Sequence, residues 1–237
     1  MKSFATFLMA VVLLTACQSK KEEQTASDTN TAAEGWITLF DGQSMNGWRI
    51  FKNKPNNSWE VLDGTLHCKP FVEGADNQRS DLITEGQYDN FEFSFEWKIS
   101  AQGNSGVIYL CSEDYNESYE TGPEYQVLDD SGYPGQVSSS NLSACNYDMH
   151  GIESKKLNPA GEWNEGKIVV NNKKVEHWLN GEKVVEYETD SEDWIARRNS
   201  SKWKDFPGYG TVSNGHIALQ DHGNEVWYRN LKIRSLN

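Results

Sequence analysis

Hydrophobic and polar residues alternate with a period of two along most of this chain, which is the pattern of half-buried β-strands. In residues 91–99, aromatic and aliphatic side chains occupy every second position, and Glu, Ser and Lys occupy the positions between them. One face of this predicted strand is therefore apolar and the other is polar. Similar runs predict strands at 105–111, 124–128, 167–171, 174–179, 183–188, 216–220 and 226–234.

Turn residues separate these runs and favour antiparallel pairing. Asn180-Gly181 is typical of a two-residue hairpin, because both central residues of such a turn need positive φ. Further turn candidates are Asp41-Gly42, Asp63-Gly64 and Asn214-Gly215, and residues 191–196 are predicted to form one short helical turn. Many short antiparallel strands over about 200 residues predict an all-β jelly-roll sandwich of two antiparallel sheets, with no internal linker.

The first residues are expected to be an export signal. Lys2 precedes an apolar stretch at 4–14, which is too short for a membrane span of about 20 residues. The stretch ends in Leu-Thr-Ala-Cys17, which resembles a bacterial lipobox and predicts cleavage before Cys17 and its lipidation; an ordinary signal peptide with a chance cysteine is the alternative. We expect a signal peptide at 1–16, a lipidated, flexible tether at 17–35 and one domain at 36–237. The predicted location is the cell envelope, at the periplasmic or surface face of the outer membrane.

Composition narrows the class of partner. Nine Trp, ten Tyr and nine Phe exclude a disordered chain. The net charge of −13 repels phosphate backbones, so nucleic acid is not an expected partner. Besides Cys17 there are three cysteines without metal-site or redox spacing, Cys68, Cys111 and Cys145, and we expect them to be small buried apolar residues.

Sequence motifs of common hydrolases and nucleotide-binding enzymes are absent from the chain. It has no G-x-S-x-G, P-loop or H-E-x-x-H motif. It also lacks the E-x-D-x-x-E strand with which many jelly-roll glycosidases present two carboxylates, which argues against a two-carboxylate mechanism.

Two predicted strands nevertheless carry polar faces. Glu124 and Gln126 share a face of the run at 124–128, and a core would reject this pair, so they are expected to face water or a site. Gln220 and His222 share a face at the end of the run at 216–220, where they suit hydroxyl binding and proton transfer. His177 alternates with apolar neighbours and is as compatible with a core histidine as with a catalytic one.

Several blocks of the sequence resemble the 3-keto-disaccharide hydrolase family, which was long described as a domain of unknown function. They are WITLFDGQSMNGW at 36–48, GNSGV at 103–107, GPEYQVLD at 122–129, PAGEWN at 159–164, VEHWLNG at 175–181, IALQDHG at 217–223 and VWYRNLKI at 226–233. The blocks follow the family order, and the resemblance spans about residues 36–236.

The resemblance implies a concanavalin-like jelly roll with a concave face, in a secreted or lipid-anchored protein of the Bacteroidetes type. It also implies a glycoside substrate that an upstream sugar 3-dehydrogenase has oxidised at C3. A C3 ketone acidifies the C2 proton, so a base can remove it; the enolate then expels the C1 substituent, and water adds to the enone. Such a site needs a base, an electrophile for the enolate oxygen and a proton donor.

The resemblance maps roles onto particular residues. His222 is the first candidate for proton transfer or as a metal ligand, Glu124 is a base, ligand or hydroxyl acceptor, and His177 is a second imidazole if its strand register permits. The candidate substrate contacts are Gln220, Gln126, Glu96, Lys98 and Asn104, and Lys98 is also a candidate for stabilising the enolate. A divalent cation held by Glu124, His177 and His222 is compatible with the sequence but not required by it. The alternative function is that of a non-catalytic carbohydrate-binding lipoprotein on the same fold.

Overall fold

The computed structural model of the protein describes residue 1 and residues 35–236. Cys17, nearly all of the predicted signal peptide and nearly all of the predicted tether lie outside the described residues. Within the described part of the chain, no helix combines the length and the apolar character that a membrane crossing requires.

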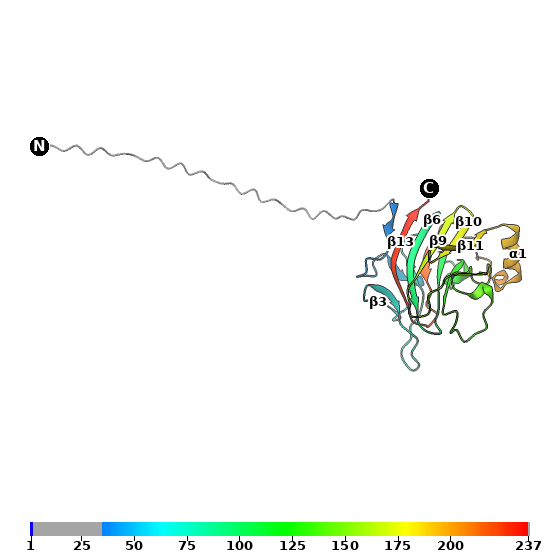
Figure 1. Ribbon diagram of the computed structural model, residues 1–237, viewed down its shortest axis with the longest axis horizontal. Helices are drawn as coiled ribbons and strands as arrows, with labels where there is room; N and C mark the ends of the chain where they lie inside the picture. The colour runs from blue at the N-terminus through cyan, green and yellow to red at the C-terminus, as the bar shows by residue number, and fades with distance from the viewer. Residues whose placement is uncertain (2–34, 237) are drawn as a thin grey trace. The chain divides into compact units, whose positions relative to one another are not determined.

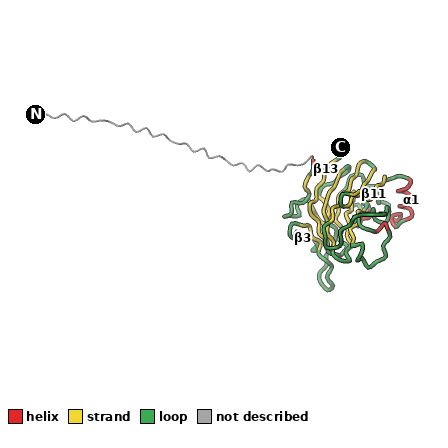
Figure 2. Tube along the Cα trace, in the orientation of Figure 1, coloured by secondary structure: helices red, strands yellow, loops and turns green. Residues whose placement is uncertain are grey.

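Residues 35–236 form two antiparallel sheets (Figures 1 and 2). The larger sheet has the order β11 (Glu182–Glu188), β10 (Lys174–Leu179), β9 (Asn164–Asn171), β6 (Phe91–Ile99), β13 (Val226–Ser235), β4 (Thr65–Cys68) and β3 (Trp59–Leu62), with β1 (Ile37–Thr38) paired to β13. The smaller sheet has the order β2 (Trp48–Ile50), β5 (Leu82–Thr84), β12 (His216–Leu219), β7 (Asn104–Cys111) and β8 (Glu124–Leu128). These sheets confirm the predicted all-β jelly-roll sandwich.

Short helices lie in the connections. They are η2 (Phe51–Asn53), η3 (Ser118–Glu120), η4 (Ser139–Asn141), α1 (Glu192–Ser200) and η5 (Lys202–Asp205). The helical turn predicted at 191–196 is part of α1, which begins after Ser191 because the Ser191 side chain accepts a hydrogen bond from the Trp194 amide.

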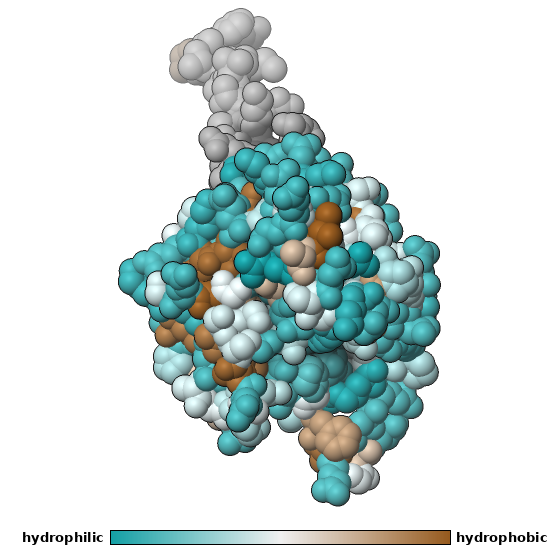
Figure 3. Space-filling model, turned by 90° about the vertical axis from the view of Figure 1, so that its right-hand side faces the viewer, coloured by the Kyte–Doolittle hydropathy of each residue, from teal (hydrophilic) through white to brown (hydrophobic). Residues whose placement is uncertain are grey.

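The core lies between the inner faces of the two sheets. Phe93, Phe95 and Trp97 of β6 are at most 1% exposed, as the alternation predicted. Phe95 packs edge-on against Tyr125 of β8 in the opposite sheet, with ring centroids 5.3 Å apart. Each such aromatic side chain contributes about 1.5–3 kcal/mol when it is fully buried. Figure 3 shows the contrast with the outside, where the visible face is largely hydrophilic with scattered hydrophobic residues.

Local predictions agree with the structure where the strands are long. Strands β6, β8 and β10 have the predicted bounds, and the hairpin between β10 and β11 turns at Asn180 and Gly181, with φ of 47° and 81°. Strands β1 to β5 have two to four residues each and were not predicted, because alternation is hard to detect over so few positions. Cys68, Cys111 and Cys145 are free and buried, as expected.

The candidate active site

A small cavity of about 140 Å³ lies on the outer face of the smaller sheet. Strand alternation produces this arrangement: Tyr125 and Val127 point into the core, so Glu124 and Gln126 point to the opposite side. The lining residues are Asn104, Tyr119, Glu124, Gln126, Tyr147, Lys202, Trp203, Gln220 and His222. The structure therefore brings five residues predicted from the sequence into one pocket, from strands β7 and β8 and from the end of β12.

Glu124 is the carboxyl group in this pocket. Its side chain is buried, and no hydrogen bond or ion pair to its carboxylate is found among residues 35–236. Burial raises the pKa of Glu124 to about 8, and the positive charge of Lys202 opposes this shift only in part. At neutral pH the carboxyl group is therefore mostly protonated and can donate a proton.

His222 lies just beyond β12, at the rim of the same pocket. Its Nε2 is 3.3 Å from Nδ2 of Asn104, so the amide helps to orient the imidazole. Partial desolvation of the ring lowers the pKa of His222 from its usual 6.5, the Lys202 charge adds to this shift, and the charge of Asp221 opposes it. A lowered pKa keeps the ring neutral at pH 7, where it can accept a proton.

Amide side chains form the floor between these two groups. Gln220 donates its backbone N–H to the carbonyl of Gly106, and Gly106 pairs with Gln126, so the three residues form a row across β12, β7 and β8. The buried Oε1 of Gln220 and Oδ1 of Asn104 have no hydrogen-bond partner in the described part of the protein. A buried acceptor without a hydrogen bond destabilises the folded protein by about 1–3 kcal/mol. Both oxygens are therefore well suited to accept hydrogen bonds from the hydroxyl groups of a bound sugar.

His177 lies elsewhere, in the core between the sheets. It is completely buried with Val175 and Leu179, and its Nε2 and Nδ1 lie 2.8 Å from the Tyr109 hydroxyl and 3.0 Å from the Ala144 carbonyl oxygen. Burial lowers the pKa of His177 to about 4. Both ring nitrogens thus have protein partners, and the structure does not bring this imidazole to Glu124 and His222. The strand register makes His177 a core residue.

Glu96 and Lys98 lie on the outer face of β6, in the other sheet. The Glu96 carboxylate accepts a hydrogen bond of 2.7 Å from Arg229 Nε, and Lys98 Nζ lies 4.2 Å from the centre of the Trp227 ring. They occupy the polar face predicted for this strand, but the pocket lies on the other sheet, so neither residue lines it. Their expected roles as substrate contacts stay predictions, which this pocket does not support.

The candidate metal ligands are not assembled either. Glu124 and His222 line the pocket, whereas His177 points into the core. Among the residues that the structure describes, no three His, Cys, Asp or Glu side chains come together in a way that could hold a metal ion.

Four lining residues were missed by the sequence analysis. Tyr119, Tyr147, Lys202 and Trp203 come from η3, η5 and an irregular segment, so no period-two pattern marks them. Trp203 donates its indole N–H to the Tyr147 carbonyl at 3.0 Å and stacks on Tyr209 at 4.3 Å, which holds this wall in place.

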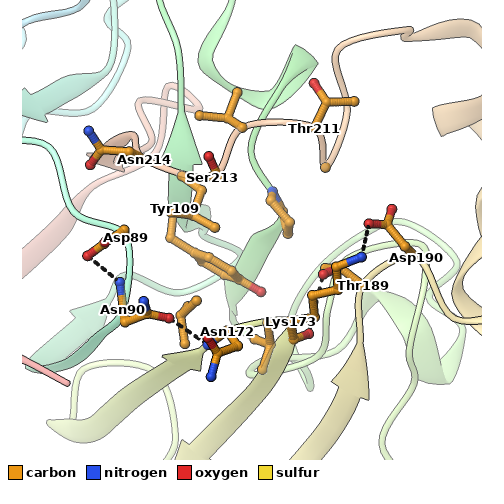
Figure 4. Close-up of a pocket in the computed structure, with 16 residues that line it drawn as sticks. Asp89, Asn90, Tyr109, Asn172, Lys173, Thr189, Asp190, Thr211, Ser213 and Asn214 are labelled. Atoms are coloured by element: carbon orange, nitrogen blue, oxygen red, sulfur yellow. Dashed lines mark hydrogen bonds and ion pairs between the residues drawn. The ribbon is translucent and has the colours of Figure 1, made fainter. Parts of the chain in front are cut away.

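A second cavity, of about 470 Å³, is larger but chemically different (Figure 4). Tyr109 lies at its centre, and hydroxyl and amide groups such as those of Thr211 and Asn214 surround it. Its Lys173 is already paired with Asp190, with 3.0 Å between Nζ and Oδ2. Its described lining includes no imidazole, so it does not offer the carboxyl and imidazole pair of the smaller pocket.

Comparison with known proteins identifies the family. The model of the 3-keto-alpha-glucoside-1,2-lyase-like domain matches residues 35–234. The chain belongs to this family. It is also 35% identical over 231 residues to the 3-keto-disaccharide hydrolase of Bacteroides thetaiotaomicron, with 86% of this chain and 80% of the relative covered. The resemblance read from the sequence blocks is thus confirmed.

Crystal structures of relatives in this family's fold support the assignment. A protein of Parabacteroides distasonis ATCC 8503 that is assigned as a glycosyl hydrolase matches with a TM-score of 0.79 and 40% identity, covering 86% of this chain and 95% of that one. A second protein from the same organism, with the same assignment, matches with a TM-score of 0.62 and 26% identity, covering 85% and 99%.

Proposed function

We propose that this protein cleaves the glycosidic bond of glycosides that carry a keto group at C3, by proton removal at C2, elimination and hydration. Membership of the 3-keto-alpha-glucoside-1,2-lyase-like family and the 3-keto-disaccharide hydrolase relative identify a glycoside-cleaving enzyme. One observation carries the mechanism: Glu124, with its raised pKa, and His222, with its lowered pKa, line the same pocket. Environments that push two pKa values apart assign the acid and the base.

The two groups have complementary tasks. Neutral His222 accepts the C2 proton, and the electrons of the C–H bond form the enolate with C3 and its oxygen. The C3 carbonyl then re-forms, a double bond forms between C1 and C2, and the bond from C1 to the leaving oxygen breaks. Glu124 gives its proton to that oxygen. Water then adds at C1 and gives one proton to the Glu124 carboxylate, while His222 returns its proton to C2, so that both groups are restored and the net result is hydrolysis.

The lining favours elimination over the usual hydrolysis of a glycoside. Retaining and inverting glycosidases place two carboxyl groups on either side of the scissile bond. Glu124 is the one carboxyl side chain among the described residues that line this pocket. A C3 ketone removes the need for a second carboxyl group. The carbonyl delocalises onto its oxygen the negative charge that forms at C2 when the C2 proton is removed.

A comparison of oxidised and unoxidised substrates tests this proposal. A 3-keto disaccharide and its unoxidised parent are incubated with the protein in heavy water, and released sugar and deuterium at C2 are measured. We expect release and exchange with the 3-keto substrate alone. Equal turnover of the unoxidised parent would overturn the proposal. Binding of sugar without any release would instead support the carbohydrate-binding alternative.

The chemistry of the substrate points to a partner enzyme, and the sequence of the N-terminal region points to a cellular location. A 3-keto glycoside must come from an oxidoreductase that acts on the C3 hydroxyl, so we propose a sugar 3-dehydrogenase as the partner in the pathway. The lipobox at Cys17 supports a lipid-anchored enzyme in the cell envelope.

A further inference from the structure

We infer that Lys202 is a catalytic residue whose ammonium group stabilises the negative charge on the C3 oxygen of the enolate. This inference rests on the proposed function and adds the electrophile that the reaction requires. The expected candidate for this task, Lys98, lies on the other sheet between aromatic rings.

The backbone around Lys202 is well held. It is the first residue of η5, and the Ser201 side chain caps this turn by accepting from the Trp203 amide at 3.3 Å. The Lys202 amide donates to Asp148 Oδ2 at 3.4 Å. Burial of Trp203 fixes the turn further, since this indole is completely buried. A group that is fixed before the reaction stabilises charge without a cost of reorganisation.

Two aromatic rings direct the ammonium group. Lys202 Nζ lies 4.4 Å from the ring centre of Tyr147 and 4.4 Å from that of Trp203, and both rings line the pocket together with Lys202 itself. Such cation–π contacts attract the ammonium group to the ring faces and favour one position of the charge. The rings thus hold the ammonium group at the wall of the pocket.

The charge of Lys202 is available to a ligand. Lys202 forms no side-chain ion pair within residues 35–236, although the charges of Glu124 and Asp148 act on it through space. The rings of Tyr147 and Trp203 partly shield the ammonium group from water, and this desolvation lowers the pKa of Lys202. Because Glu124 keeps its proton at neutral pH, it compensates this charge poorly. An anion that develops in the pocket is therefore attracted to Lys202.

The test compares Lys202→Met and Lys202→Arg with Lys204→Met, which removes an exposed lysine from the same turn outside the pocket lining. The rate of deuterium uptake at C2 and the kcat and KM for a 3-keto disaccharide are measured, together with Tm. We expect Lys202→Met to lose about 10²–10³-fold in exchange and in kcat with little change in KM, because the charge acts on the enolate. Lys202→Arg should retain part of the rate, and Lys204→Met should match the unchanged protein.

The outcomes separate this inference from the proposed function. Wild-type exchange in Lys202→Met, in an active parent protein, would overturn the role of Lys202 and leave the proposed function standing. Equal losses in Lys202→Met and Lys202→Arg, accompanied by lower Tm, would show a structural role and overturn the inference too. If the parent protein neither exchanges C2 hydrogen nor releases sugar, the proposed function fails and the inference fails with it.

Discussion

The carboxylate of Glu124 lies over Gly106 of the neighbouring strand, so closely that a Cβ at residue 106 would be 2.3 Å from Oε1. In the strand register Glu124 pairs with Ile108, and Gly106 lies two residues from Ile108 on the same strand. The Glu124 side chain therefore leans along the sheet to reach Gly106. The missing side chain at Gly106 makes the space in which the proposed proton donor sits.

Gly106→Ala should therefore displace the Glu124 carboxyl group. We expect kcat to fall by about 10²-fold, since a shift of about 1 Å in a reacting group has this effect. Overpacking should also destabilise the protein by about 1–3 kcal/mol. Urea unfolding of the double variant Gly106→Ala/Glu124→Ala provides the control. Its destabilisation should be smaller than the sum of the two single effects, and strict additivity would show that the two residues do not compete for space.

Glu124→Gln should increase stability at alkaline pH. The folded protein holds the Glu124 proton up to a pKa of about 8, whereas the unfolded chain loses it near the ordinary value of 4.5. Between these values the unfolded state binds fewer protons, so the free energy of unfolding falls as pH rises. Thermal unfolding at several pH values should show a higher Tm for Glu124→Gln at pH 8 and convergence with the parent protein near pH 4.5. A constant difference across this range would contradict the raised pKa.

The pH profile of kcat/KM should be bell-shaped. Activity should fall on the acid side as His222 is protonated, with a midpoint below 6.5 because its pKa is lowered. Activity should fall on the alkaline side near pH 8, where Glu124 loses its proton. Initial rates with a 3-keto glycoside between pH 4 and 10 measure both limbs. A rate that keeps rising through pH 9 would rule out Glu124 as the acid.

His222→Ala should fold normally and lose about 10²–10⁴-fold in activity, the usual range for a lost acid–base group. Deuterium uptake at C2 of a 3-keto substrate should stop with it. His177→Gln is the matched control: it loses core hydrogen bonds to Tyr109 and Ala144, so Tm should fall while exchange at C2 persists. Unchanged deuterium uptake in His222→Ala would show that another group removes the C2 proton.

Cys17→Ser should abolish lipidation. The lipobox predicts that the thiol of Cys17 carries the lipid after cleavage, so the variant should stay uncleaved or become soluble. Partitioning into detergent, with mass spectrometry of the N-terminus, measures this. Ser19→Ala, two residues further along the predicted tether, is the control and should keep its lipid. Detergent partitioning of Cys17→Ser equal to that of the parent would contradict the lipid anchor.

Period-two alternation is a local property, and for this reason the sequence alone determined the longer strands and which of their residues share a face. Neighbouring residues are enough to predict the aromatic face of β6 and the hairpin at Asn180 and Gly181. They also show that Glu124 and Gln126 share one face of β8. The family blocks similarly identified the fold and a glycoside-cleaving enzyme, because they depend on residue identity in chain order.

Only the tertiary structure decided which polar face forms the pocket. Glu96 and Lys98 alternate with apolar residues just as Glu124 and Gln126 do, but alternation does not specify the sheet to which a strand belongs. Lys202 reaches the pocket from a helical turn far along the chain, without any periodic signal. Whether His177 is a core residue or a pocket residue likewise depended on which side of β10 packs against the other sheet. Strand pairing and loop closure are contacts between distant residues, and a local pattern does not contain them.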